Sequence, residues 1–213
     1  MAGCCNPRGC DRFFGERFAR RVARRYRAKG LDRTAQQIVD FLAERGIEGA
    51  TVLEIGGGVG EIQLELLKRG ARRAVNLELS PAYEREARAL LADAGMAGRV
   101  ERRRVDIAVA PESVEPADAV VLHRVVCCYP DYERLLGAAA DRAGRLLVFS
   151  YPRRNALTRL VVAAQNLAFR VMRREFRTFT HPPARMVEVL RARGLEPAYA
   201  DGRVVWQVAG LAR

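Results

Sequence analysis

Short apolar runs alternate along this chain with stretches in which apolar residues recur every three or four positions. Runs of the first kind are typical of buried strands, and stretches of the second kind are typical of amphipathic helices. Strands are predicted at 52–55, 73–78, 100–105, 118–122 and 145–149. Helical stretches lie between them, for example at 61–67 and 81–94. This order of elements predicts an α/β domain with a parallel sheet.

The last part of the chain has a different pattern. A short helix is predicted from 186 to 193, and Gly194 ends it. Two more strands are predicted at 195–200 and 204–209, and Asp201-Gly202 between them is a strong turn signal. The sequence therefore predicts a closing antiparallel hairpin.

The first predicted strand leads into a glycine-rich turn, Glu54-Ile55-Gly56-Gly57-Gly58-Val59-Gly60. Glycine lets the backbone turn sharply and lets a ligand approach main-chain atoms without a Cβ in the way. A dinucleotide-binding loop has the form G-x-G-x-x-G/A, but here the last position holds Glu61. The lysine of a P-loop is missing as well. The remaining pattern, E-x-G-x-G-x-G with acidic residues on both sides, suits a cationic ligand without phosphates.

S-adenosylmethionine is such a ligand, with a sulfonium, an ammonium group and no phosphate. In this turn, and in the order of elements over residues 50–150, the chain resembles the class I S-adenosylmethionine-dependent methyltransferases. The resemblance implies a Rossmann-like, seven-stranded sheet in the order 3-2-1-4-5-7-6, with strand 7 antiparallel and helices on both faces. It also implies N-terminal helices that cover the cofactor. We therefore expect basic amphipathic cap helices at 1–46 and the cofactor-binding domain at 47–213.

Further ligand contacts are predicted at the carboxyl ends of the strands, where open α/β sheets bind their ligands. Glu78 ends the second strand and can accept hydrogen bonds from both ribose hydroxyls. The resemblance implies that Glu54 holds the methionine moiety and that Asp106 contacts the adenine, although strand ends also commonly turn through Asp. The expected cofactor-binding residues are Glu54, Ile55, Gly56, Gly57, Gly58, Gly60, Glu78, Leu79, Asp106, Ile107 and His123.

His123 follows the fourth predicted strand and is one of only two histidines. Its ordinary pKa near neutrality makes it the candidate catalytic base for an acceptor that must lose a proton. Lining the cofactor pocket and satisfying a buried carbonyl are the alternatives for this side chain. Arg124 beside it is a candidate substrate contact, and His181 is expected in a turn.

The N-terminal segment is strongly basic in a chain of formal net charge +12. An apolar residue recurs in it every four positions, at Phe14, Phe18, Val22 and Tyr26. We interpret this segment as a cap helix that lays its apolar stripe on the domain. Contact with an anionic acceptor, nucleic acid (an RNA backbone) or a membrane surface is the alternative. Tyr26 is a candidate substrate contact, and Asp32 is a good N-cap for the next helix.

A long helix is predicted from 155 to about 174, with apolar residues almost all the way round. One face holds Leu157, Leu160, Val161, Ala164, Leu167, Ala168 and Val171. A helix of this kind is either buried between other elements or lines a hydrophobic acceptor pocket. We expect it to be buried.

The five cysteines include two adjacent pairs, Cys4-Cys5 and Cys127-Cys128, together with Cys10. An odd number of cysteines without C-x-x-C spacing indicates reduced thiols in a cytoplasmic protein and no metal site. No apolar run reaches membrane-spanning length, and the start lacks the apolar core of a signal peptide.

Within the class, the segments 127–131 and 149–153 are distantly similar to magnesium-protoporphyrin O-methyltransferases, which carry a His-Tyr pair near the position of Cys127-Cys128. That similarity implies a large, apolar, acidic acceptor. We therefore expect an S-adenosylmethionine-dependent methyltransferase that acts on a small or medium-sized molecule. The alternatives are an RNA methyltransferase, favoured by charge alone, an NAD-linked oxidoreductase, disfavoured by Glu61, and a non-catalytic binding module.

Overall fold

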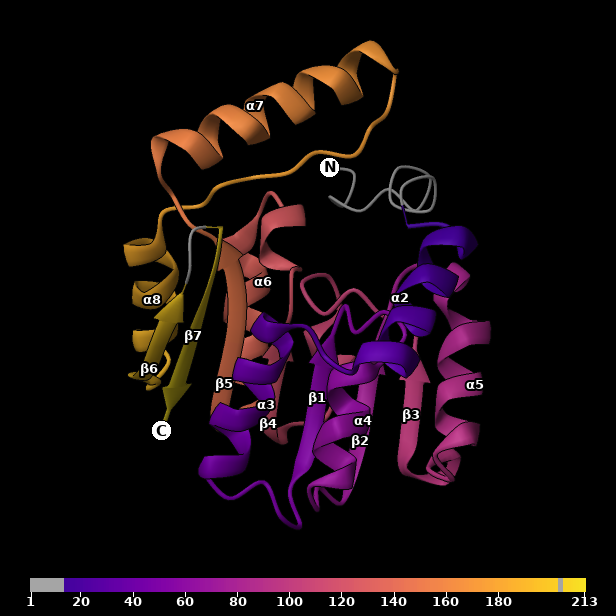
Figure 1. The fold of residues 1–213 in the computed structure, drawn as a ribbon. Helices are drawn as coiled ribbons and strands as arrows, with labels where there is room; N and C mark the ends of the chain where they lie inside the picture. Colours follow the sequence, from indigo (N-terminus) through magenta and orange to yellow (C-terminus); the bar gives the residue numbers. More distant parts are fainter. Residues whose placement is uncertain (1–13, 203–204) are drawn as a thin grey trace.

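The computed structural model describes residues 14–202 and 205–213 of the chain. Its strands form one sheet in the order β3-β2-β1-β4-β5-β7-β6 (Figure 1). They are β1 Thr51–Ile55, β2 Arg73–Leu77, β3 Val100–Arg103, β4 Ala117–Leu122, β5 Ala143–Pro152, β6 Glu196–Gly202 and β7 Trp206–Ala212. The first five strands pair in parallel, and β7 is antiparallel to both β5 and β6. The predicted strand order and directions are confirmed.

Helices lie on both faces of this sheet (Figure 1). The α-helices of the described residues are α2 Glu16–Lys29, α3 Arg33–Glu44, α4 Glu61–Lys68, α5 Glu84–Asp93, α6 Tyr132–Asp141, α7 Ala156–Val171 and α8 Pro183–Arg191, and α7 alone among them lies away from the sheet. Along β4, Val120 and Leu122 belong to the core shared with α6 and α8, whereas Ala119 and Val121 belong to the core shared with α3 and α4. Because both faces are covered, each central strand is a nearly continuous apolar run.

The two N-terminal helices differ in how they pack. Asp32 caps α3 as predicted, accepting hydrogen bonds from the N–H groups of Thr34 and Ala35 at 2.9 and 3.0 Å. The apolar residues of α3 are buried in the core over the sheet. Helix α2 instead buries Ala19 and Ala23 in a smaller cluster with α5. The division into a cap at 1–46 and a domain at 47–213 stays a prediction.

The predicted turn at Asp201-Gly202 is wrong. Both residues belong to β6, where Asp201 pairs with Val208 and Gly202 with Gln207. A Cβ on Gly202 would lie 2.6 Å from Cγ of Gln207. Gly202 therefore allows two strands to approach closely. In the sequence, a glycine at such a position cannot be distinguished from a glycine in a turn.

The expected burial of the helix after β5 is also wrong. Figure 1 shows α7 lying across one end of the molecule, away from the sheet. Only Thr158 and Phe169 of this helix are buried. The apolar stripe faces solvent because the following segment, 174–179, contacts the opposite side of the helix. The periodicity correctly predicted an amphipathic helix but not which side meets the protein.

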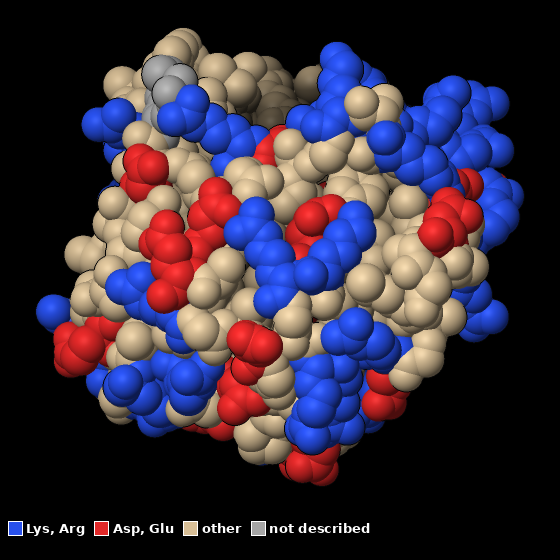
Figure 2. All heavy atoms as spheres, turned by 60° about the horizontal axis from the view of Figure 1, so that its bottom comes forward, with Lys and Arg blue, Asp and Glu red and all other residues tan. Residues whose placement is uncertain are grey.

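Positive charge does not form one continuous surface on the face shown in Figure 2. Acidic side chains lie between the basic ones there. Several arginines are paired across elements, such as Arg27 with Asp93 and Arg69 with Asp40, both at 2.8 Å. Within the described part of the chain, no helix has both the length and the apolarity that crossing a membrane requires.

Candidate active site

A cavity of about 560 Å³ opens at the carboxyl ends of the strands. Among the residues that line it are the predicted cofactor residues Glu54, Ile55, Gly56, Gly57, Gly58, Glu78, Leu79, Asp106, Ile107 and His123. Arg124 lines the cavity as well, whereas Gly60 and Tyr26 do not. The fold thus brings together side chains from the ends of four strands that are far apart in the sequence.

The turn between β1 and α4 needs glycine for two separate reasons. At Gly57 there is no space, because a Cβ would lie 2.2 Å from Nδ2 of Asn76 and 2.8 Å from Cδ of Glu54. Gly60 has a φ of +81°, which side chains of L-residues disfavour, and it is the N-cap of α4. Gly60 therefore shapes the turn without touching the cavity.

Glu54 is a carboxylate buried beneath this turn, with only 2 % of the residue exposed. It accepts a hydrogen bond from the N–H of Gln63 at 3.2 Å. Burial, and then the nearby carboxylate of Glu61, raise the pKa of Glu54 well above its usual range. A positively charged group in the cavity would favour its ionised form, because an opposite charge offsets both effects.

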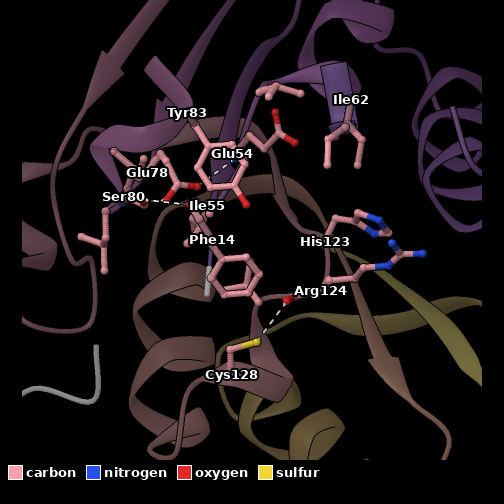
Figure 3. Close-up of a pocket in the computed structure, with 18 of the residues that line it drawn as sticks. Phe14, Glu54, Ile55, Ile62, Glu78, Ser80, Tyr83, His123, Arg124 and Cys128 are labelled. Atoms are coloured by element: carbon pink, nitrogen blue, oxygen red, sulfur yellow. Dashed lines mark hydrogen bonds between the residues drawn. The ribbon is translucent and has the colours of Figure 1, made fainter. Parts of the chain in front are cut away.

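Glu78 follows β2, and its carboxylate is fixed by the backbone on two sides. Oε2 accepts from the N–H of Gly58 at 2.9 Å, and Oε1 accepts from the N–H of Ser80 at 2.8 Å (Figure 3). Burial raises the pKa of Glu78, and the two backbone N–H groups act in the opposite direction. Each oxygen retains a lone pair for a further donor such as a ribose hydroxyl.

Arg102, near the end of β3, supports the same turn from outside the cavity. Its guanidinium donates to the carbonyl of Gly58 at 3.0 Å and to Oε2 of Glu84 at 2.9 Å. This residue was not predicted as part of the site, because one arginine in the run Arg102-Arg103-Arg104 carries no pattern of its own. Its role is visible only from the strand order, which places β3 beside β2.

Asp106 follows β3 and takes part in a small polar network. Oδ2 accepts from the hydroxyl of Tyr129 at 3.1 Å, and Oδ1 accepts from the N–H of Ala108 at 3.0 Å. Ile107 is almost fully buried, whereas Leu79 is half-buried at the cavity wall. These residues form an apolar pocket with one acidic edge.

His123 lies on the side of the cavity opposite Glu78 (Figure 3). Its Nδ1 is 3.1 Å from Oγ of Ser150, and that Oγ also accepts a hydrogen bond from the N–H of Arg124 at 2.9 Å. Ser150 is fully buried, so its hydroxyl proton needs an acceptor, and His123 Nδ1 is the acceptor within reach. The ring proton is thereby assigned to Nε2. Burial and the Arg124 guanidinium lower the pKa of His123 to about 3, so the ring is neutral near pH 7.

Arg124 has a strained backbone beside this histidine. Its φ of 59° is in the left-handed region, which is uncommon for a residue with a side chain. The guanidinium is 2.8 Å from Oδ2 of Asp32 and stacks over the Trp206 ring at 5.0 Å. These contacts hold one cationic side chain at the cavity wall and join the end of β4 to the start of α3.

The side of the cavity next to α2 is aromatic and basic. Phe14 and Phe18 line it with ring centroids 5.6 Å apart, and Phe18 also meets Tyr83. Sequence analysis treated these rings as the packing stripe of a cap helix and so missed them as site residues. Further lining residues that were not predicted are Arg21, Val22, Arg25, Asp32, Val59, Glu61, Ile62, Leu77, Ser80, Tyr83, Val105, Val125, Cys128, Tyr129 and Leu135.

Tyr26, a predicted substrate contact, points elsewhere. Its hydroxyl donates to the carboxylate of Glu65 and accepts from Nζ of Lys68 at 3.1 Å. Burial, and then the hydrogen bond to Glu65, raise the pKa of Tyr26 to about 12. In this structure the side chain joins α2 to α4, away from the cavity.

A family model described as a methyltransferase domain matches residues 23–199, which is most of the chain. The chain belongs to the methyltransferase domain family. A comparison with curated protein sequences finds no match.

Solved structures of other methyltransferases have the same fold. Magnesium protoporphyrin IX methyltransferase from Synechocystis PCC 6803, with bound S-adenosylhomocysteine, is 19% identical with a TM-score of 0.70 over 84% of this chain and 82% of that one. An O-methyltransferase family protein from Burkholderia thailandensis is 21% identical with a TM-score of 0.72, over 97% of this chain and 63% of that one. A Pyrococcus horikoshii protein proposed to be an RNA methyltransferase is 12% identical with a TM-score of 0.59, over 84% and 83% of the two chains. At these identities the similarity establishes the fold alone.

The residues of the cavity fit S-adenosylmethionine better than a dinucleotide. Glu61, the first residue of α4, lines the cavity, and burial raises the pKa of its carboxyl group. A carboxylate at this helix N-terminus occupies the place where a pyrophosphate would bind. Glu54 and Glu78 add two more acidic groups, which match the cationic centres and the ribose of this methyltransferase's cofactor.

Proposed function

We propose that this methyltransferase transfers the methyl group of S-adenosylmethionine to a small or medium-sized apolar acceptor that carries an acidic group. When bound, the cofactor supplies an electrophilic methyl group on a sulfonium. The observation that carries the proposal is that one cavity combines two kinds of lining residue. The glycine turn and its carboxylates form what we call the cofactor side, and the aromatic rings and arginines form what we call the acceptor side.

On the cofactor side, each residue has a binding role. Glu78 would hold the ribose hydroxyls, since its two oxygens are already fixed by backbone N–H groups. Glu54 would favour the ammonium end of the methionine moiety through its buried negative charge. Asp106 and Leu79 would frame the adenine with Ile107. Catalysis of such a displacement comes mainly from holding both reactants in one orientation and from excluding water.

On the acceptor side, Phe14 and Phe18 provide flat apolar surface, and Arg21 and Arg25 lie on α2 together with Phe18. Aromatic rings bind apolar ring systems, and guanidinium groups bind carboxylates in a bidentate geometry. Arg124 supplies a third cation near Arg25, since Oδ2 of Asp32 is 2.8 Å from the Arg124 guanidinium and 3.9 Å from that of Arg25. An apolar molecule with a carboxylate satisfies all of these groups at once.

His123 fits a positioning role better than that of a catalytic base. A neutral ring with its proton on Nε2 can donate a hydrogen bond into the cavity but cannot accept a proton at that atom. We propose that it orients the polar group of the acceptor. An acceptor atom that is already ionised has no proton to release on methylation, and the proton of any other acceptor atom would pass to solvent.

An RNA acceptor is the second candidate. The exposed arginines of α2 favour it, because phosphate contacts need many cations along one surface.

We also propose that the enzyme is cytoplasmic, since the odd number of cysteines is typical of reduced thiols.

The test is transfer of isotope-labelled methyl groups from S-adenosylmethionine to a panel of aromatic carboxylic acids. The matched controls are the primary amides of the same acids, together with a short RNA. We expect the acids to be methylated well above their amides, and Phe18→Ala and Arg21→Met to raise KM. Methylation of the RNA alone, weakening steeply with salt, would establish the second candidate instead.

A further inference from the structure

Helix α7 exposes an apolar stripe that no described part of the chain covers. Leu157, Leu160, Leu167 and Val171 are 61%, 67%, 62% and 76% exposed. These positions are three, seven and four residues apart, so they lie on one face of the helix. Large apolar side chains exposed together in this way mark an interaction surface, because each of them gains by leaving water.

The helix is held in place by its other side. Phe169 packs edge-on against Phe176 with ring centroids 5.7 Å apart. Asn166 forms a pair of hydrogen bonds with the backbone of Thr178, at 2.7 and 2.9 Å. The stripe is therefore free for a partner without any change in the fold.

Charge defines what kind of partner fits. From 153 to 174 the chain has no acidic residue and six arginines, Arg153, Arg154, Arg159, Arg170, Arg173 and Arg174. Arg153 and Arg154 come just before the helix N-terminus, where a positive charge is unfavourable for the helix itself. An anionic surface in contact with both ends of the helix would offset this unfavourable interaction.

We propose that α7 binds the surface of an anionic lipid bilayer. The leucines and valines of the stripe enter the boundary of the acyl chains, and the arginines contact lipid phosphates and carboxylates. At 16 residues the helix extends about 24 Å, which is too short to cross a bilayer. Because its apolar stripe lies on one face, the helix binds in the plane of the surface. This is peripheral binding, in keeping with the lack of a membrane-crossing helix among the described residues.

Two other occupants fit less well. A second copy of the chain, seated stripe against stripe, would bring six arginines next to six more with no acid between them. An RNA would use the arginines but leave the apolar stripe in water. A bilayer with anionic headgroups satisfies both features together.

The helix also lies beside the cavity. Phe176, which packs under α7, has its ring centroid 5.2 Å from that of Phe14, a cavity-lining residue. Docking through α7 thus brings the aromatic side of the cavity close to the lipid. This step rests on the proposed function, and it specifies the acceptor class as molecules that partition into membranes.

The experiment is flotation of the full chain with vesicles, with about 30 mol % phosphatidylserine in phosphatidylcholine against phosphatidylcholine alone. We expect wild type to float with the anionic vesicles only and to be released by salt. Leu160→Ser/Leu167→Ser should lower the bound fraction at least about tenfold. Arg159→Gln/Arg170→Gln should also lower it. Val109→Ser, which removes an exposed apolar residue elsewhere, should leave it unchanged.

Several results would overturn the proposal. Wild type that does not float with anionic vesicles is one, and a serine variant that floats as well as wild type is another. Sedimentation showing a wild-type dimer that the serine variant dissociates, without flotation, would assign the stripe to a second copy. Calorimetric binding of S-adenosylhomocysteine to every variant confirms that each is folded. It also separates a failure of membrane binding from a failure of the proposed function.

Discussion

The backbone N–H of Gly58 donates a hydrogen bond of 2.9 Å to Oε2 of Glu78. This contact joins the turn after β1 to the end of β2, two parts of the cofactor side that are twenty residues apart. The carboxylate that we propose to bind the ribose is therefore set in position by the glycine turn that lines the cavity beside it. Changes in either part should affect cofactor binding together.

Gly57→Ala should abolish cofactor binding. The new Cβ would lie 2.2 Å from Asn76 Nδ2 and 2.8 Å from Glu54 Cδ, so the turn must move. We expect a loss of about 1–3 kcal/mol in the free energy of unfolding, as for other overpacked sites. Calorimetry with S-adenosylhomocysteine and urea unfolding measure both effects. Gly98→Ala is the control, since a Cβ there meets nothing within 4 Å. Equal affinity in the two variants would contradict the account.

Arg102→Met should weaken cofactor binding although the side chain does not line the cavity. The variant loses the hydrogen bond to the Gly58 carbonyl and the pairing with Glu84. We expect about a tenfold rise in the Kd of S-adenosylhomocysteine, which corresponds to about 1.4 kcal/mol. Arg103→Met, at the next position of the same strand, is the matched control, since this side chain pairs with Glu101 and does not line the cavity. If the two variants bind equally, Arg102 has no positioning role.

His123 should make the fold less stable in acid. Folding lowers the pKa of His123 to about 3. At a pH below the ordinary pKa of histidine, the unfolded chain therefore binds one more proton than the folded chain and is favoured. Stability from the neutral ring is complete above about pH 6.5 and is lost progressively toward pH 3. Between pH 7 and pH 5, wild type should lose up to about 2 kcal/mol relative to His123→Asn. Urea unfolding of both proteins at each pH measures the difference. A pH-independent difference would refute the buried, neutral ring.

Tyr26→Phe should leave methyl transfer and cofactor binding unchanged. Within the described part of the chain, its hydroxyl forms hydrogen bonds with Glu65 and Lys68 at the junction of α2 and α4. We expect a fall of about 1 kcal/mol in the free energy of unfolding, the usual cost of a lost side-chain hydrogen bond. A large rise in KM for the acceptor would return Tyr26 to the substrate site.

The fold and most of the cofactor side were predictable, because both depend on local signals. Strand ends carry the functional residues in this architecture, so finding the strands places Glu78 and Asp106 at one edge. The glycine pattern around Gly57 is a short motif and is therefore visible in sequence. The space that requires it is limited partly by Asn76 of β2, and that contact is visible only in the structure.

The acceptor side and α7 were not predictable in the same way. An apolar stripe shows that a face avoids water, but it does not show which surface covers that face. Phe18 was therefore interpreted as packing, yet it is 40% exposed and lines the cavity. In α7 the predicted buried stripe is the exposed one, because Asn166 and Phe169 provide the attachment. Arg102 depends on strand order, which no local pattern encodes.

The most direct test is calorimetric titration of the intact protein with S-adenosylhomocysteine and, separately, with NAD. A Glu78→Ala variant and the exposed-site control Glu101→Ala complete the experiment. The account predicts micromolar binding of S-adenosylhomocysteine to wild type and to the control, loss of binding in Glu78→Ala, and no binding of NAD. Binding of NAD in place of S-adenosylhomocysteine, or full affinity in Glu78→Ala, would contradict it.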